Sequence, residues 1–186
     1  MAIDSHAQGS LIYQNTLGVG KEQYIYRCNM AYIPESGVPQ FLKVEGDGFT
    51  AELWYAEGEG APRSSLEAVA GSQVGFRTGT TAGLIRGKAK LDIPDTFGGD
   101  KVTLQLRVWN NEGGKFTSWA SALEKGESNL WVHELAGVDR LGAPKLGTGS
   151  IAVGLQGGLL ILCTPEPSVL ALGVLGLGLL LRARRS

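Results

Sequence analysis

The sequence predicts an all-β protein: an antiparallel β-sandwich of the jelly-roll or immunoglobulin-like type, followed by a short C-terminal transmembrane helix. Residues 49–55 and 102–109 give the clearest signal, because apolar and polar side chains alternate along both, as in strands with one buried face. Glycine, 28 of 186 residues, joins Pro and Asn in breaking the chain at short intervals. No amphipathic segment of helical length separates the strands, so parallel βαβ units are not expected.

The first strands are expected at residues 10–14 and 23–30, which are rich in β-branched and aromatic side chains. Residues 31–33 extend the second strand in this interpretation. The Pro-Glu-Ser-Gly sequence at 34–37 then ends it.

The segment at residues 49–55 is expected to be a half-buried strand. Its inward face consists of Phe49, Ala51, Leu53 and Tyr55, and its outward face of Thr50, Glu52 and Trp54. A loop rich in Gly, Pro and Ser follows at 57–65, and weaker strands are expected at 66–69 and 73–77.

Two further alternating segments predict the strands at residues 88–94 and 102–109. The inward side chains are Ala89, Leu91 and Ile93 in one segment and Val102, Leu104, Leu106 and Val108 in the other. Loops at 95–100 and 110–114 flank the second strand. A short helical turn is expected at 118–124, and the closing strands at 129–135 and 158–163.

The C-terminal tail has three parts in order: Pro165-Glu166-Pro167, an apolar run at residues 169–181, and the cluster Arg182, Arg184 and Arg185. As a helix, the run would be about 20 Å long at 1.5 Å per residue, shorter than a hydrocarbon core of roughly 30 Å. It therefore predicts a short membrane segment. Arginine at its C-terminal end places that end in the cytoplasm and the preceding chain on the other side.

These three parts resemble the PEP-CTERM sorting signal of Gram-negative bacteria, here with an all-β body of unknown function. The resemblance implies an exosortase-type membrane enzyme as a partner, which recognises Pro165, Glu166 and Pro167 and removes the tail. It also implies a transient stay in the inner membrane, then the envelope surface or the extracellular space, with extracellular polysaccharide as a further expected partner. An ordinary C-terminal membrane anchor is the alternative.

The predicted organisation is a signal-peptide remnant or disordered N-terminus at residues 1–8, a β-sandwich body at 9–163 and the sorting signal at 164–186. The C-terminal tail implies export, yet the junction-like Ser5-His6-Ala7 has no basic or apolar region before it, so we expect Met1 to be an internal start with the signal peptide upstream. Without the tail's three arginines and Glu166, 17 − 3 = 14 basic residues face 18 − 1 = 17 acidic residues. A net charge of −3 gives no reason to expect nucleic-acid binding.

No catalytic residue, metal site or cofactor is predicted, and the chain is expected not to be an enzyme. His133-Glu134 begins like a zinc-protease motif, but Gly137 stands where the second His is required. His133 is therefore expected to be an ordinary sheet residue. The sequence around Gly83–Lys88 is one residue too short between its glycines for a phosphate-binding loop.

Two functional hypotheses remain. The first is an exported structural, adhesive or polysaccharide-associated protein, in which Trp54 and Trp109 would point outward and stack on sugars. The second is a small secreted glycosidase-like hydrolase that uses two loop carboxylates. The candidate acids are Glu45, Asp47, Glu52, Glu57, Glu59, Asp92, Asp95 and Asp100. Glu45 and Asp47 are also considered as calcium ligands.

The chain has two cysteines, Cys28 and Cys163. An exported location permits a disulfide between them, which would join an early strand to the last one. Two unpaired thiols are equally consistent with the spacing.

Overall fold

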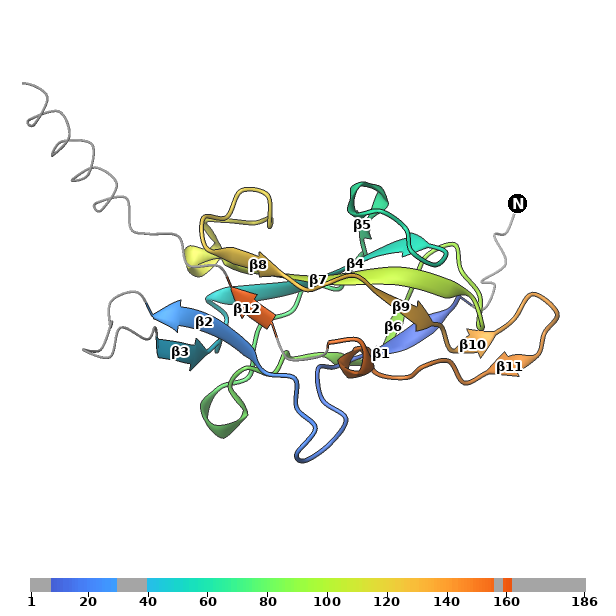
Figure 1. The fold of residues 1–186 in the computed structure, drawn as a ribbon, viewed down its shortest axis with the longest axis horizontal. Coiled ribbons are helices and arrows are strands. Elements are labelled where there is room, and N and C mark those ends of the chain that lie inside the picture. Colours follow the sequence, from blue (N-terminus) through green and yellow to red (C-terminus); the bar gives the residue numbers. More distant parts are fainter. Residues whose placement is uncertain (1–7, 30–39, 156–158, 162–186) are drawn as a thin grey trace, which may run out of the picture.

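All regular structure in the described part of the chain is β-strand or single-turn 3₁₀ helix, which confirms the all-β class (Figure 1). The computed structural model describes residues 8–29, 40–155 and 159–161. The strands are β1 (Ser10–Tyr13), β2 (Ile25–Asn29), β3 (Gln40–Lys43), β4 (Phe49–Glu57), β5 (Glu67–Ala68), β6 (Lys88–Asp92), β7 (Lys101–Asn110), β8 (Lys125–Glu127), β9 (Trp131–Glu134), β10 (Gly137–Val138), β11 (Pro144–Lys145) and β12 (Leu159–Ile161). The 3₁₀ turns are η1 (Arg63–Ser65), η2 (Gly79–Thr81), η3 (Glu112–Gly114) and η4 (Ile151–Val153).

The two strands with the clearest alternation, β4 and β7, form the centre of a five-stranded sheet. They pair antiparallel along their full length, from Phe49 opposite Asn110 to Glu57 opposite Val102. β5 lies at the outer edge of β4, whereas β8 and β9 pair with successive halves of the other edge of β7. Side chains from five strands are therefore fixed relative to one another on each face of this sheet.

Smaller sheets lie around this central pair (Figure 1). β12, β2 and β3 form one sheet, while β1 with β6 and β10 with β11 form antiparallel pairs. β12 runs parallel to β2, which differs from the fully antiparallel arrangement expected from the sequence. The two strands come from opposite ends of the chain, and a long connection of this kind allows a parallel pair where a tight hairpin does not.

The hydrophobic core lies on the inner face of the five-stranded sheet. There the expected inward residues of β4 and β7 pack against β1, β6 and the segments next to them. The fully buried members from the two long strands are Ala51, Leu53, Val102, Leu104, Leu106 and Val108. At about 25 cal/mol per Å² of buried apolar area, this layer is the main stabilising contribution to the fold. The predicted faces of both strands are thus confirmed.

The predicted inward face of the strand at 88–94 is wrong at one position. Leu91 and Ile93 are buried, but Ala89 is exposed. The cause is a register shift in the β1–β6 pair: Leu11 lies opposite Leu91, whereas Tyr13 lies opposite Lys88. One extra residue in β6 ends the simple alternation, as a β-bulge does.

The helical turn expected at residues 118–124 is also absent: this segment consists of turns and bends. The Lys125 ammonium group donates hydrogen bonds to the carbonyls of Trp119 and Ala120, 3.1 and 3.0 Å away. These contacts satisfy carbonyl groups that the next helical turn would otherwise use. Of the two weaker strands, 66–69 contains only the two-residue β5, and 73–77 makes isolated bridges at Val74 and Phe76.

Candidate functional site

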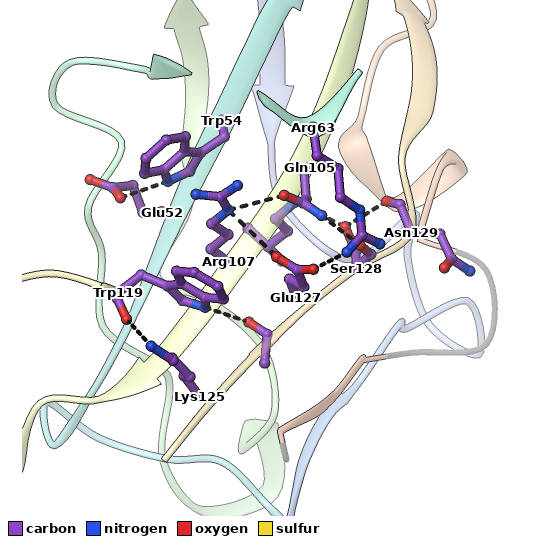
Figure 2. Close-up of polar contacts among 12 residues, drawn as sticks. Glu52, Trp54, Arg63, Gln105, Arg107, Trp119, Lys125, Glu127, Ser128 and Asn129 are labelled. Atoms are coloured by element: carbon purple, nitrogen blue, oxygen red, sulfur yellow. Dashed lines mark hydrogen bonds and ion pairs between the residues drawn. The ribbon is translucent and has the colours of Figure 1, made fainter. Parts of the chain in front are cut away.

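The outer face of the five-stranded sheet carries a cluster of aromatic and charged side chains (Figure 2). Residues directly opposite each other in an antiparallel pair point to the same face, so Glu52 lies beside Arg107 and Trp54 beside Gln105. The loop between β7 and β8 adds Trp119. We call this cluster the outer platform, and it consists of Glu52, Trp54, Arg107, Trp119, Lys125 and Glu127.

The centre of the outer platform is Arg107, whose guanidinium group lies between two indole rings. Its Cζ atom is 3.8 Å from the ring centroid of Trp54 and 4.7 Å from that of Trp119. Both tryptophans are half-buried. Each cation–π contact contributes about 0.5 to 2 kcal/mol, depending on its exposure. The two indoles are therefore held at a fixed separation.

Hydrogen bonds within the protein fix the orientation of each indole. Trp54 Nε1 donates to the Glu52 carboxylate at 2.8 Å, and the Gln73 amide donates to the other oxygen of that carboxylate at 2.8 Å. Trp119 Nε1 donates to the Gly126 carbonyl at 3.2 Å. Both indole N–H groups of the platform thus have a partner inside the protein.

Arg107 is held by polar contacts on its other side. Its Nε donates to Gln105 Oε1 at 3.0 Å and lies 3.7 Å from the Glu127 carboxylate, which also pairs with Arg63. Burial lowers the pKa of Arg107, and the carboxylates of Glu127 and Glu52 oppose that shift. Gln105 is itself buried and donates to the Ser128 carbonyl at 3.1 Å.

Sugar stacking would require both Trp54 and Trp109 to be exposed, and Trp109 does not meet that requirement, since it is packed inside the protein as most tryptophans are. Its side chain is only 1% exposed, and its Nε1 donates to the Phe116 carbonyl at 3.1 Å. The loop that follows β7 folds back and covers this ring. The second half-exposed tryptophan of the outer face is instead Trp119, which lies in a turn, where no alternation of side chains predicts the direction of the ring.

Three carboxylates border a shallow cleft of about 330 Å³ next to β4 and β5. Glu57 and Asp95, two of the candidate loop acids, line it together with Glu67, Ser65 and Tyr55. Burial raises the pKa of the Tyr55 phenol, and the charges of Asp95, Glu67 and Glu57 raise it further. The cleft is thus a region of negative potential beside a tyrosine.

The other candidate acids do not come together in one site. Most of them make surface ion pairs: Asp47 with Arg86, Glu59 with Lys101, Asp92 with Lys90, and Asp100 with Arg140. Glu45 accepts a hydrogen bond of 3.4 Å from the Gly79 N–H group. Within residues 8–29, 40–155 and 159–161, no group of three or more His, Cys, Asp or Glu side chains is placed to hold a metal ion.

Several sequence-predicted residues lie outside the described part of the chain. They are Pro165, Glu166, Pro167, Arg182, Arg184, Arg185 and Cys163. Cys28 is half-buried in β2, and the neighbouring parallel pair with β12 is described as far as Ile161 opposite Arg27. In the described segments, no helix has both the length and the apolar character needed to cross a membrane.

His133 lies in β9, as expected for a sheet residue, and is buried.

No protein-family model, no curated protein and no solved structure matches this chain.

Proposed function

We propose that the protein is an exported, non-enzymatic component of the cell envelope or extracellular matrix that associates with polysaccharide through the outer platform. One observation carries the proposal: Arg107 holds the half-exposed indoles of Trp54 and Trp119 at 3.8 and 4.7 Å. Indole rings bind the apolar C–H faces of sugar rings, and the surrounding charged groups offer hydrogen bonds to hydroxyls.

Preorganisation supports this use of the platform. Glu52 orients the indole of Trp54, and Gly126 orients that of Trp119, before any ligand arrives. Binding then costs less side-chain entropy than it would with mobile aromatic rings, which cost about 0.5 to 1.5 kcal/mol for each side chain immobilised. The cationic side chains Arg107 and Lys125 make polymers with carboxylate groups suitable ligands as well as neutral ones.

The direct test is affinity electrophoresis of the full chain through gels that contain neutral glucans, mannans or uronate polymers. We expect at least one polymer to retard the protein, and Trp54→Ala and Trp119→Ala to weaken the retardation at least about tenfold. Arg86→Ala, which removes an exposed cation elsewhere, is the control and should migrate like the unmodified protein. Equal retardation of all variants would remove the platform from the proposal.

The proposed architecture is a two-layer sandwich of the jelly-roll or immunoglobulin-like type, with a short membrane helix after it. The core between the five-stranded sheet and the β1–β6 layer supports the first part. The order Pro165-Glu166-Pro167, apolar run and arginine cluster supports the second part, together with sorting by an exosortase-type enzyme.

Mass spectrometry of the C-terminus, on protein from the native host, tests the sorting proposal. We expect a mature chain that lacks the tail beyond the Pro165 region, and an uncut chain when the processing enzyme is deleted. A soluble cytosolic form that still ends at Ser186 would contradict export and processing.

A second candidate function, a glycosidase-like hydrolase, rests on the cleft that Glu57, Glu67 and Asp95 border. Paired carboxylates at a cleft are the groups that such enzymes use as acid and as nucleophile or base. Release of nitrophenol from aryl glycosides, lost in Glu57→Gln and Glu67→Gln but retained in Trp54→Ala, would favour this function over binding.

A further inference from the structure

A pocket of about 400 Å³ lies beside β9, separate from the outer platform. Residues 128–133 form one wall, and Thr148 with residues 153–155 forms the other. Trp131 and His133 alternate with Val132, so both point to the same face of β9. They lie opposite Leu104 and Val102 of β7, which face the core.

Among the described residues, Trp131 Nε1 has no hydrogen-bond partner, and neither nitrogen of the His133 imidazole makes a well-formed hydrogen bond, since its one polar neighbour is a weak backbone contact with Gly149. The His133 side chain is only 1% exposed, so bulk water does not compensate for the missing partners. A buried polar group without a partner costs about 1 to 3 kcal/mol. Buried polar groups in folded proteins are normally paired, so incompletely paired groups on two side chains of one pocket favour a ligand with hydrogen-bonding groups there.

The pocket is shaped for the indole ring of Trp131. A Cβ atom added at Gly154 would lie 2.0 Å from Trp131 Cδ1, so the ring lies flat against the glycine backbone. The Ser150 hydroxyl accepts a hydrogen bond of 3.2 Å from the Ala152 N–H group and caps η4, the turn that leads to Gly154. The backbone at this position thus leaves room for the ring.

The chemistry of the lining selects the kind of occupant. None of the residues that line the pocket carries a carboxylate, ammonium or guanidinium group. Burial lowers the pKa of His133 and the weak backbone hydrogen bond with Gly149 only partly offsets that shift, so the imidazole is neutral at pH 7. A neutral imidazole offers one donor and one acceptor, and the Trp131 indole offers a second donor.

We infer that this pocket binds a small, uncharged ligand rich in hydroxyl groups, of the size of one sugar residue. Each hydroxyl both donates and accepts, which matches the mixed set of donors and acceptor that Trp131 and His133 present. The indole ring and Leu155 contact the apolar C–H face of such a ligand. A single imidazole does not make a zinc site, which needs at least three protein ligands. The inference does not depend on sugar binding at the outer platform.

The test follows the indole N–H signals of the ¹⁵N-labelled full chain in detergent by NMR during titration with D-glucose. We expect the Trp131 signal, assigned with Trp131→Phe, to shift and saturate with a dissociation constant on the order of 1 mM. Sodium D-glucuronate should bind at least about tenfold more weakly, because the lining offers its carboxylate no cation. Gly154→Ala should abolish the shift, since the added methyl group displaces the indole.

Two further variants keep the result interpretable. Trp54→Ala, in the outer platform, should leave the Trp131 shift unchanged, so failure of platform binding and failure of this inference are separate results. His133→Gln should weaken binding, and if it does not fold, Gly154→Ala decides. The inference is overturned if glucose at about 100 times the expected dissociation constant leaves the Trp131 signal in place, if only the charged sugar binds, or if ordered water alone fills the pocket.

Discussion

The two faces of the five-stranded sheet use tryptophan in opposite ways. On the outer face, the indole N–H groups of Trp54 and Trp119 donate to Glu52 and Gly126, and Arg107 fills the space between the rings. On the inner face, among the described residues, the Trp131 indole N–H has no partner and the His133 imidazole makes only a weak backbone contact with Gly149. Among the described residues, the indole N–H groups of the outer platform are paired within the protein. Those of the pocket beside β9, called the inner pocket below, are not fully paired.

This difference shows how burial determines what a polar group requires. The indoles of the outer platform are half-exposed and would find water if a partner were lost, so each hydrogen bond contributes modestly. The buried imidazole of His133 has no such alternative. The outer platform is therefore suited to transient contact with a polymer, and the inner pocket to enclosure of a small molecule.

The largest expected effect is the loss of stability when a buried tryptophan of the outer face, rather than a half-exposed one, is removed. Trp109→Ala should lower the free energy of unfolding by about 3 to 5 kcal/mol, because the ring is fully covered and leaves a cavity. Trp54→Ala should cost about 2 to 3 kcal/mol, because it removes both the contact with Arg107 and the hydrogen bond to Glu52. Urea denaturation measures both. Equal losses would show that Trp54 belongs to the core and not to an open platform.

The sequence predicted the parts of these regions that depend on local pattern. The alternation in residues 49–55 and 102–109 placed Glu52, Trp54 and Arg107 on the outer face correctly. His133 was correctly expected to be a sheet residue. Alternation is a property of neighbouring residues, so it can be read without knowing what packs against the strand.

The sequence did not predict what tertiary contacts decide. Trp119 joins the platform only because β8 returns beside β7, and Trp109 is covered only because the Phe116 loop folds over it. The pocket requires η4 and Gly154 to pack against β9, which lies about twenty positions earlier in the chain. None of these contacts between distant segments produces a periodic pattern in the sequence of either segment.

A matched pair of substitutions tests the satisfied indole against the unsatisfied one. Trp54→Phe removes a donor that Glu52 uses, and Trp131→Phe removes a donor without a partner. Both lose similar ring area, so their difference isolates the hydrogen bond. We expect Trp54→Phe to be the less stable variant by about 1 to 2 kcal/mol in urea denaturation. The reverse order would mean that Trp131 Nε1 already has a strong partner.

A smaller effect is expected at Tyr13, a fully buried residue of β1 whose hydroxyl has no partner among the described residues. Tyr13→Phe removes this hydroxyl and should leave stability unchanged or raise it by about 1 kcal/mol. Burial raises the pKa of Tyr13, and the charge of Glu52 adds to the shift.

The same residue gives a pH test of that interpretation. The unfolded phenol ionises near its ordinary pKa of 10.0, whereas the folded one stays neutral to higher pH. The unfolded state thus releases a proton that the folded state retains, and stability falls as pH rises above 10. Denaturation midpoints between pH 9 and pH 11, taken as about one unit on either side of that pKa, should fall less steeply in Tyr13→Phe than in the unmodified protein. Identical slopes would show that the hydroxyl is solvated in the folded state.

The smallest expected effect is the pH dependence that His133 confers on the inner pocket. Burial lowers its pKa below the ordinary 6.5, so under acidic conditions the unfolded chain binds a proton that the folded chain does not. The stability associated with neutral His133 is therefore complete above pH 6.5 and declines as the pH falls from 6.5 toward the lowered folded pKa.

Asp139 serves as the control. Its carboxyl pKa is also lowered, mainly through a hydrogen bond from the Ala143 N–H group, so it changes the stability only in a separate pH range below 3.8. Denaturation midpoints of His133→Gln should lose the slope just below pH 6.5, and those of Asp139→Asn should keep it. A slope retained in His133→Gln would show that His133 binds its proton equally well in the folded and unfolded states, so that burial does not keep the imidazole neutral.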